Sequence, residues 1–158
     1  MSLEEETLAF RRRILPVDHP DIGDSMNNLA SSYYELGRHE EALSLREETL
    51  TFRRRILPAD HPHIGTSMSS LASSYSELGR HEEAVSLEEE TLTFMRRILP
   101  ADHPHIGTSM HNLAVSYYEL GRDGEALSLE EGIFAFRRRI LPTDHRDIVT
   151  SMGILASS

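Results

Sequence analysis

The sequence contains no cysteine, so it can form neither a disulfide nor a thiolate metal site. The absence of cysteine is compatible with both an oxidising and a reducing compartment. It has no apolar run near the roughly 18 residues that a membrane span needs. The N-terminus is Met-Ser-Leu followed by acids, which does not resemble a secretory signal. Acidic residues outnumber basic residues, and the formal net charge of −10 argues against nucleic acid or an anionic membrane as the main partner. We therefore expect a cytoplasmic protein that binds neither.

The sequence also lacks the patterns of common catalytic and cofactor sites. It has no glycine-rich phosphate loop and no nucleophile elbow in a strand–turn–helix setting. The histidine–proline–histidine runs at 61–63 and 103–105 could suggest metal pairs, but the proline between the rings keeps them from converging. A metal site needs three or four placed ligands. We expect no catalytic residue, no metal and no cofactor, and we interpret the linker histidines and aspartates as helix caps.

What the sequence has is an internal repeat with a period of about 42 residues. Three sets of identical residues are evenly spaced along the chain: Pro16, Pro58, Pro100 and Pro142; His19, His61, His103 and His145; and Leu29, Leu71, Leu113 and Leu155. We divide the chain into full repeats at 16–58, 59–100 and 101–142. A partial second helix at 1–15 precedes them and a partial first helix at 143–158 follows, all in a single array over 1–158.

Each full repeat centres on a glycine that separates two helix-periodic segments, namely Gly37, Gly79 or Gly121. Glycine reaches positive φ without a Cβ clash, so it can end one helix and let the chain reverse. Each repeat is therefore predicted to be a helical hairpin with the glycine at its elbow. The predicted fold is all-α, with eight helical segments of which two are partial.

In the first repeat, the first helix is predicted from Pro20 to Leu36, with Asp18 or His19 as its cap. Its buried stripe consists of Ile22, Met26, Leu29, Ala30, Tyr33 and Leu36. The second helix is predicted from His39 to Leu57. Its main stripe is Ala42, Leu45, Thr49, Phe52 and Ile56, and a flanking stripe is Leu43, Leu50 and Leu57. Proline after the second helix prevents its continuation.

Runs of three arginines end the second helices at 11–13, 53–55 and 137–139, while acids crowd the earlier turns. This order suits the helix dipole. Because acids are abundant around these runs, we favour charge pairing at the helix ends over phosphate binding.

The motif residues Leu29, Ala30, Tyr33 and Gly37, followed by Glu-Glu-Ala at 40–42, resemble a tetratricopeptide repeat. The long period and the Asp-His-Pro linker are similar to the variant of kinesin light chains, which also occurs in the sensor arrays of NB-ARC or NACHT signalling ATPases. The resemblance implies a right-handed α-solenoid of antiparallel helix hairpins, a superhelix in which the first helices line a concave groove. It implies that this groove holds an extended peptide or a helix of a partner.

The sequence departs from the family pattern at two positions of the second helix. Where the family carries a large aromatic residue, this chain has Arg46, Glu88 and Glu130. Where the family carries a small alanine, it has Thr49, Thr91 and Ile133. These changes affect the expected packing of the hairpins rather than the architecture.

The groove positions of the family fall on one face of each first helix, and most differences between the first helices of this chain occur on the same face. The predicted groove residues are Asp24, Asn27, Asn28, Ser31, Tyr34, Glu35, Thr66, Ser69, Ser70, Ser73, Ser76, Glu77, Thr108, His111, Asn112, Val115, Tyr118 and Glu119. The variation has two interpretations: drift on a solvated surface, or a groove tuned along its length. Asn, Ser and Tyr can hydrogen-bond a peptide backbone.

Two functions remain open from the sequence. The first is a non-catalytic scaffold that binds a protein or peptide partner in the groove. The second is a structural, self-associating array, for example the sensor region of a larger NLR-like signalling ATPase. Apolar residues of the two partial helices, such as Leu3 and Phe10 at one end and Leu155 at the other, have lost a packing neighbour. Self-association through these open ends is therefore a further possibility.

Overall fold

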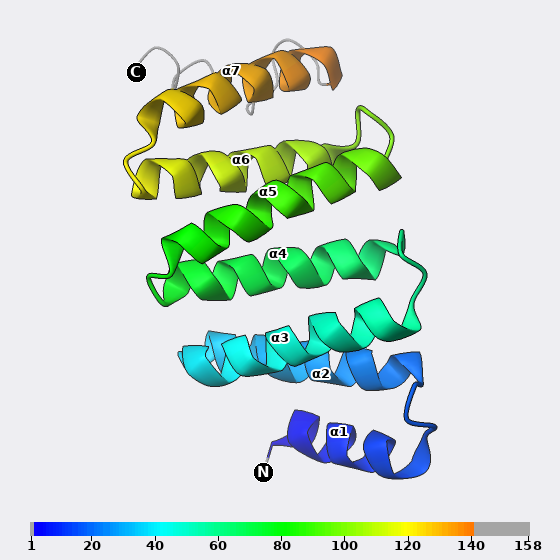
Figure 1. Ribbon diagram of the computed structural model, residues 1–158. Helices are drawn as coiled ribbons and strands as arrows, with labels where there is room; N and C mark the ends of the chain where they lie inside the picture. The colour runs from blue at the N-terminus through cyan, green and yellow to red at the C-terminus, as the bar shows by residue number, and fades with distance from the viewer. Residues whose placement is uncertain (1, 141–158) are drawn as a thin grey trace. The chain divides into compact units, whose positions relative to one another are not determined.

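The computed structural model describes residues 2–140, and all of its regular structure there is helical (Figure 1). The helices are α1 (Leu3–Ile14), α2 (Pro20–Glu35), α3 (His39–Ile56), α4 (Pro62–Glu77), α5 (His81–Ile98), α6 (Pro104–Glu119) and α7 (Asp123–Ile140). They are the first seven of the eight predicted segments, and α1 is the predicted partial second helix. The eighth, at 143–158, lies outside the described residues.

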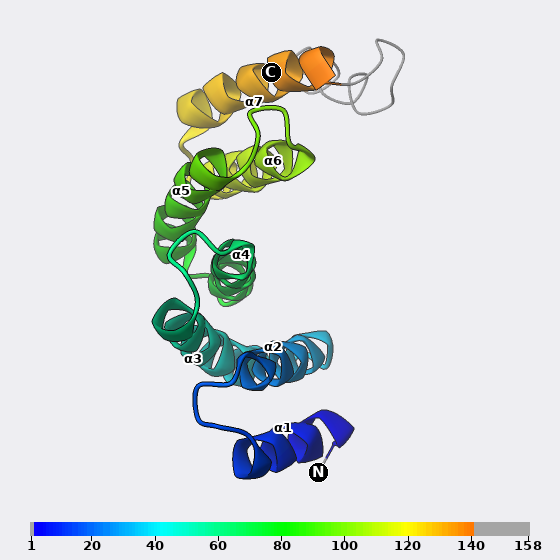
Figure 2. The same ribbon diagram turned by 90° about the vertical axis from the view of Figure 1, so that its right-hand side faces the viewer.

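The chain divides into two compact units, 1–80 and 81–158. In the first unit α1 packs on α2, α2 packs on α3, and α3 packs on α4. Figure 2 shows α3 to one side of α2 and α4, as expected for hairpins whose first and second helices form separate layers. In the second unit α6 packs against both α5 and α7. The first unit holds the predicted hairpin α2–α3 and the second holds α6–α7, while the boundary between the units falls between α4 and α5.

The first helices begin in the same way in all three repeats. Proline occupies the first turn of α2, α4 and α6, and the preceding histidine caps the helix with its side chain. In α2 the Nδ1 atom of His19 accepts a hydrogen bond of 3.1 Å from the backbone N–H of Asp21. The cap is therefore His19 rather than Asp18.

Helix α2 ends at Glu35, one residue before the predicted end, and this changes the environment of Leu36. Leu36 is the C-cap residue and is 70% exposed. Its prediction as part of the buried stripe was wrong, because the helical spacing no longer applies once the chain leaves the helix. The other end of the stripe, Ile22 and Met26, is buried as predicted.

The predicted glycine elbows are confirmed. Gly37, Gly79 and Gly121 have φ values of 77°, 75° and 74°, in the left-handed region. At the first elbow the N–H of Gly37 donates to the carbonyl of Tyr34 at 3.1 Å, and the N–H of Arg38 donates to the carbonyl of Tyr33 at 2.8 Å. This pair of bonds is the Schellman motif, which satisfies the last carbonyls of the helix.

The core of the first unit joins α1, α2 and α3. Its buried members are Leu8, Ile22, Met26, Leu29, Ala30, Leu45 and Phe52. Tyr33 and Ile56, both predicted for the buried stripes, are partly buried against this cluster. Burying one leucine-sized side chain contributes roughly 1.5–3 kcal/mol, so this cluster holds the three helices together.

A polar contact recurs beside the core in each repeat. The hydroxyl groups of Tyr33, Tyr75 and Tyr117 donate to Glu5, Glu47 and Glu89 at 2.8, 3.2 and 2.9 Å. Each bond joins a first helix to the second helix that precedes it along the chain. The guanidinium groups of Arg38, Arg80 and Arg122 lie over the same tyrosine rings. The tyrosine of the family motif thus links one repeat to the next.

Candidate functional site

None of the predicted groove residues is buried, and ten of the eighteen are exposed while the other eight are half-buried. In the first unit these positions lie on α2 and α4, and Asn28, Glu35, Thr66, Ser73 and Glu77 among them are exposed. In the second unit they lie on α6, where all except the half-buried His111 are exposed. We call these positions the first-helix face of each unit.

In the first unit, the floor of this face contains a buried arginine. Arg46 of α3 is 8% exposed, and its Nη1 donates to the carbonyl of Ser70 at 2.9 Å and to Oγ of Ser74 at 2.8 Å. Its guanidinium also lies 4.6 Å from the centre of the Tyr34 ring. Burial lowers the pKa of Arg46. Arg46 therefore replaces the aromatic residue of the family by a polar link from α3 to α2 and α4.

Tyr34 extends this cluster to the edge of α4. Its hydroxyl donates to Oε1 of Glu77 at 2.9 Å. Burial and this bond to the carboxylate both raise the pKa of Tyr34. Two predicted groove residues from different first helices are therefore held together, which fixes the orientation of the Tyr34 ring.

In the second unit, the first-helix face has a different character. Val115 and Tyr118 of α6 are 42% and 39% exposed, which makes them the large apolar side chains that this helix presents to solvent. His111 lies with its Nδ1 3.9 Å from the buried carboxylate of Glu130, and Glu119 lies 3.0 Å from Nδ1 of His81. This face therefore combines apolar and acidic groups.

Glu88 occupies the same repeat position as Arg46. Its Oε2 atom is buried without a hydrogen-bond partner in the described part of the chain. Burial raises the pKa of Glu88 to about 7, with a smaller rise from Glu119 and an opposing hydrogen bond from Ser116. The folded state therefore favours the protonated carboxyl group, while an unfolded chain would lose that proton near the ordinary glutamate pKa of 4.5.

This shift predicts a pH dependence of stability. The contribution of Glu88 is fully present below pH 4.5 and is lost as the pH rises through about 7. A shift of this size corresponds to at most about 3 kcal/mol. Solvent still reaches this side chain, and its screening reduces the contribution to about 1–2 kcal/mol.

We expect Glu88→Gln, which keeps the shape but cannot ionise, to remove this part of the pH dependence. Urea unfolding of both proteins at pH 5, 6, 7 and 8 measures the effect. The gain of the variant over the wild type should grow with pH. A gain that is constant across this range would contradict the assignment.

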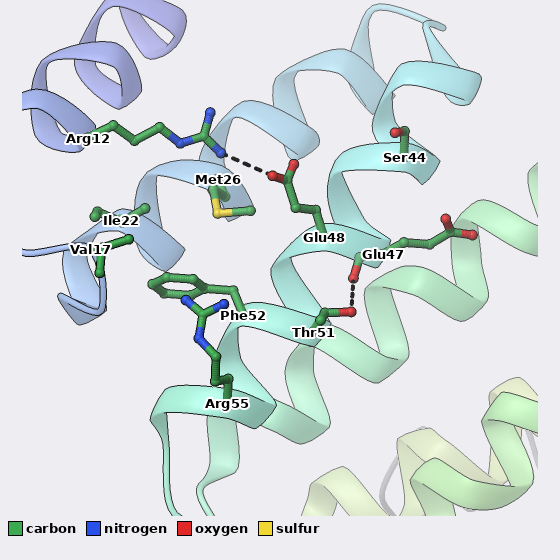
Figure 3. Close-up of a pocket in the computed structure, with 10 residues that line it drawn as sticks. All are labelled: Arg12, Val17, Ile22, Met26, Ser44, Glu47, Glu48, Thr51, Phe52 and Arg55. Carbon is green, nitrogen blue, oxygen red and sulfur yellow. Dashed lines mark hydrogen bonds and ion pairs between the residues drawn. The ribbon is translucent and has the colours of Figure 1, made fainter.

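Sequence reasoning missed a hollow on the side of the second helices. In the first unit it has a volume of about 780 Å³ and is lined by Arg12, Val17, Ile22, Met26, Ser44, Glu47, Glu48, Thr51, Phe52 and Arg55. Figure 3 shows that these residues come from α1, the linker, α2 and α3. Its floor is apolar, and an ion pair of 3.4 Å joins Arg12 to Glu48 at its edge. We call this hollow the second-helix pocket.

The second unit contains the same pocket, with a volume of about 480 Å³. Its lining residues are Arg96, Ala101, Ile106, Met110, Gly132, Ala135, Phe136 and Arg139. Each of them lies two repeats after a lining residue of the first pocket. The repeat period could have aligned these residues in the sequence, but nothing in it marked them as a hollow, because they come from three helices and a linker.

The arginine runs are engaged differently in the two units. In the first unit Arg12, Arg53 and Arg55 pair with Glu48, Asp24 and Asp18, which confirms the predicted charge pairing there. Arginines lie over phenylalanine rings in both units, Arg13 and Arg55 in the first and Arg97, Arg138 and Arg139 in the second. The position that corresponds to Glu48 is Gly132, whereas Asp18 is retained as Asp102.

Residues 2–140 hold neither a candidate metal cluster nor a candidate membrane span. No cluster of three or more histidine, aspartate or glutamate side chains in this part is arranged to hold a metal ion. No helix there combines the length and the apolarity that a membrane span requires.

Comparisons with known proteins identify the repeats. Family models of the tetratricopeptide repeat match residues 21–97 and 106–147, which together exceed half of the chain. The chain belongs to the tetratricopeptide-repeat family. A crystal structure of a putative kinesin light chain from Podosopora anserina, with nearly identical TPR-like repeats, is 30% identical and has a TM-score of 0.88. The match covers 98% of this chain and 74% of that one. The repeats are therefore of the kinesin-light-chain-like type.

Two more distant structures share the fold of this tetratricopeptide-repeat chain. BtubC (BKLC) from P. vanneervenii is 23% identical with a TM-score of 0.85, over 98% of this chain and 62% of that one. A Rap protein complexed with Competence and Sporulation Factor is 14% identical with a TM-score of 0.70, over 96% of this chain and 40% of that one. No curated protein matches the sequence. Tetratricopeptide repeats generally serve as non-catalytic scaffolds and commonly mediate protein–protein interactions.

Proposed function

We propose that this protein is an interaction module whose first-helix face binds an extended segment of a partner protein. The observation that carries the proposal is the contrast between the two sides of each first helix. In α6 the stripe of Ile106, Met110 and Leu113 is buried, while Val115 and Tyr118 are exposed together on the other side. An apolar side chain of a partner could cover Val115 and Tyr118 and remove them from solvent.

Two further features support a peptide as the occupant. Amide and hydroxyl side chains such as Asn28, Ser73 and Asn112 are exposed along the same face and can hydrogen-bond a peptide backbone. The Rap structure with the same fold is a complex with Competence and Sporulation Factor.

The test uses a random peptide library selected on the immobilised chain, followed by affinity measurements on the recovered peptides. We expect Asn28→Ala, Asn112→Ala and Tyr118→Ala together to weaken binding by at least about tenfold, which corresponds to 1.4 kcal/mol. The melting temperature should hardly change, because exposed substitutions usually shift stability by less than about 0.5 kcal/mol.

A matched control carries Glu40→Ala and Ser86→Ala, two exposed positions on the second helices. The control should bind like the wild type. Unchanged affinity of the triple variant would remove the first-helix face as the site. A large loss of its stability would show that the face is structural.

One observation favours self-association as a second function. Helix α1 packs on α2 but leaves Leu3, Phe10 and Ile14 exposed by 75%, 49% and 55%. We expect the chain to associate at high concentration through this surface, and Phe10→Glu to keep it monomeric, since burial of such side chains drives association. Sedimentation across a wide concentration range measures the association state. A wild-type chain that stays monomeric at every concentration would contradict self-association. The predicted counterpart Leu155 lies outside the described residues.

A further inference from the structure

The two second-helix pockets have the same frame but different charges. Both keep two arginines, an isoleucine, a methionine and a phenylalanine at corresponding positions. Where the first pocket has Val17, Glu48 and Thr51, the second has Ala101, Gly132 and Ala135. All three differences make the side chain smaller, and one of them removes a carboxylate.

In the first pocket the arginines are neutralised within the unit. Arg12 lies 3.4 Å from Glu48, and Arg55 lies 3.1 Å from Asp18. An anionic ligand would have to displace these carboxylates. The first pocket is therefore a poor anion site.

In the second pocket both arginines lack a carboxylate. Gly132 stands where Glu48 would face Arg96, and no ion pair in the described part of the chain includes Arg96 or Arg139. The neighbouring acid, Glu131, is exposed and does not line the pocket. Asp102, which corresponds to Asp18, is retained beside Ala101 but is exposed and forms no ion pair with Arg139 in the described part of the chain. Two guanidinium groups without an ion pair therefore border the same hollow.

Arg139 is already held in place at this border. Its Nη2 donates to the carbonyl of Ala101 at 3.1 Å, and its guanidinium lies 5.3 Å from the centre of the Phe136 ring. Side chains that are ordered before binding lose less entropy when a ligand arrives. Below the arginines, Ile106, Met110 and Phe136 form a buried apolar floor.

We propose that the second-helix pocket of the α5–α7 unit binds a phosphorylated segment of a protein partner, with the phosphate between Arg96 and Arg139 and a neighbouring apolar side chain on Ile106 and Met110. A phosphate group carries about −1.5 to −2 charges at pH 7 and so matches two guanidinium groups, whereas one carboxylate would match only one. Arginine forks also bind phosphate oxygens in a bidentate manner. The apolar floor gives such a segment an advantage over free phosphate.

The net charge of −10 does not oppose this site at close range. Charges separated by more than about 8 Å are largely screened at physiological ionic strength. The local pair of arginines therefore decides the affinity, while the distant acids mainly slow the approach of an anion. The site lies on the second helices, so it is independent of the first-helix face.

The chain carries its own matched reporters for a test. Met26 lies in the first pocket and Met110 in the second, at corresponding positions. We suggest labelling the methionine methyl groups with ¹³C and titrating the full chain with the peptide Gly-Ser-Leu-phosphoserine-Phe-Ser-Gly at pH 7.5. We expect the Met110 signal to shift and the Met26 signal to stay. The unphosphorylated peptide and inorganic phosphate should each bind at least about tenfold more weakly.

Two charge variants sharpen the test. Gly132→Glu restores the missing carboxylate and should weaken phosphopeptide binding by at least about tenfold, while Gly132→Gln, of the same size, should bind more tightly than Gly132→Glu. A Cβ at this position would meet only the terminal methyl of Met110, at 3.2 Å, and this flexible end can move. The converse change, Glu48→Ala combined with Asp18→Ala, should free Arg12 and Arg55 and make Met26 respond to the phosphopeptide.

Several results would overturn the proposal. They are an unchanged Met110 signal at saturating peptide, equal affinity of Gly132→Glu and Gly132→Gln, equal affinity for the unphosphorylated peptide, or equal affinity for inorganic phosphate. None of these readouts depends on the groove residues, so they do not bear on the first-helix face.

Discussion

The Leu29→Ala variant is expected to lose about 3 kcal/mol of unfolding free energy. Leu29 is 5% exposed and belongs to the cluster that joins α1, α2 and α3. Replacing a buried leucine by alanine removes apolar contacts and leaves a cavity, and such changes cost about 2–5 kcal/mol. Because repeats are stabilised by contacts with their neighbours, the loss should affect the whole first unit.

The neighbouring residue provides the control for this variant. Asn28 precedes Leu29 in the same helix but is exposed. Asn28→Ala should change the unfolding free energy by less than about 0.5 kcal/mol. Urea unfolding, monitored by circular dichroism, compares the unfolding free energies of the two variants. Similar values for both variants would mean that the helix does not bury the face assigned to it.

The second large effect is expected at an elbow. Gly79 has φ of 75°, and no other atom lies within 4 Å of the place where a Cβ would stand. Valine there would have to adopt the left-handed region or force the turn open, so Gly79→Val should cost about 2 kcal/mol. The cause is the backbone alone, because no neighbouring side chain is in the way.

Gly124 tests this reasoning because it differs from Gly79 in one respect. It also has open space at the place where a Cβ would stand, but it lies in α7 and has no positive φ. Gly124→Val should therefore change stability by only a few tenths of a kcal/mol. If thermal melting shows that Gly79→Val is as stable as Gly124→Val, the elbow does not depend on glycine.

The repeat allowed most of the fold to be predicted from the sequence. Pro20 and His19 mark where a helix begins, and Gly37 marks where the chain reverses. Because the repeats are so similar, a correct interpretation of one repeat also predicted the others. Leu36 was misplaced because helical spacing cannot tell the last helical residue from the cap that follows it. The end of a helix depends on which carbonyls the elbow satisfies, here through the N–H groups of Gly37 and Arg38.

The exposed first-helix face was also predictable, because variation between repeats was concentrated there. Contacts within that face were not. The sequence showed that Arg46 and Glu88 depart from the family pattern. It did not show how each of these oppositely charged side chains would be hydrogen-bonded. Arg46 finds acceptors on Ser70 and Ser74, whereas Glu88 keeps a buried oxygen without a partner in the described part of the chain. Such outcomes depend on side-chain geometry that a repeat pattern does not contain.

The charge difference between the two second-helix pockets was present in the sequence but was not noticed. The arginine run at 137–139 was grouped with the run at 53–55, and both were expected to pair with acids. A comparison of positions two repeats apart shows that Glu48 corresponds to Gly132 and Asp24 to Thr108. The many acids elsewhere in the chain concealed that Gly132 stands where Glu48 pairs with an arginine in the first unit.

The proposal that the first-helix face binds the partner is tested most directly by the tyrosine rings. Tyr34, which is bonded to Glu77 of the same face, and Tyr118 lie on this face. The hydroxyl groups of Tyr33, Tyr75 and Tyr117 are instead bonded to glutamates of the preceding second helix. We expect a library-selected peptide to shift the ring NMR signals of Tyr34 and Tyr118 and to leave those of the other three in place. Shifts confined to Tyr33, Tyr75 and Tyr117, or no shift at saturation, would contradict the account.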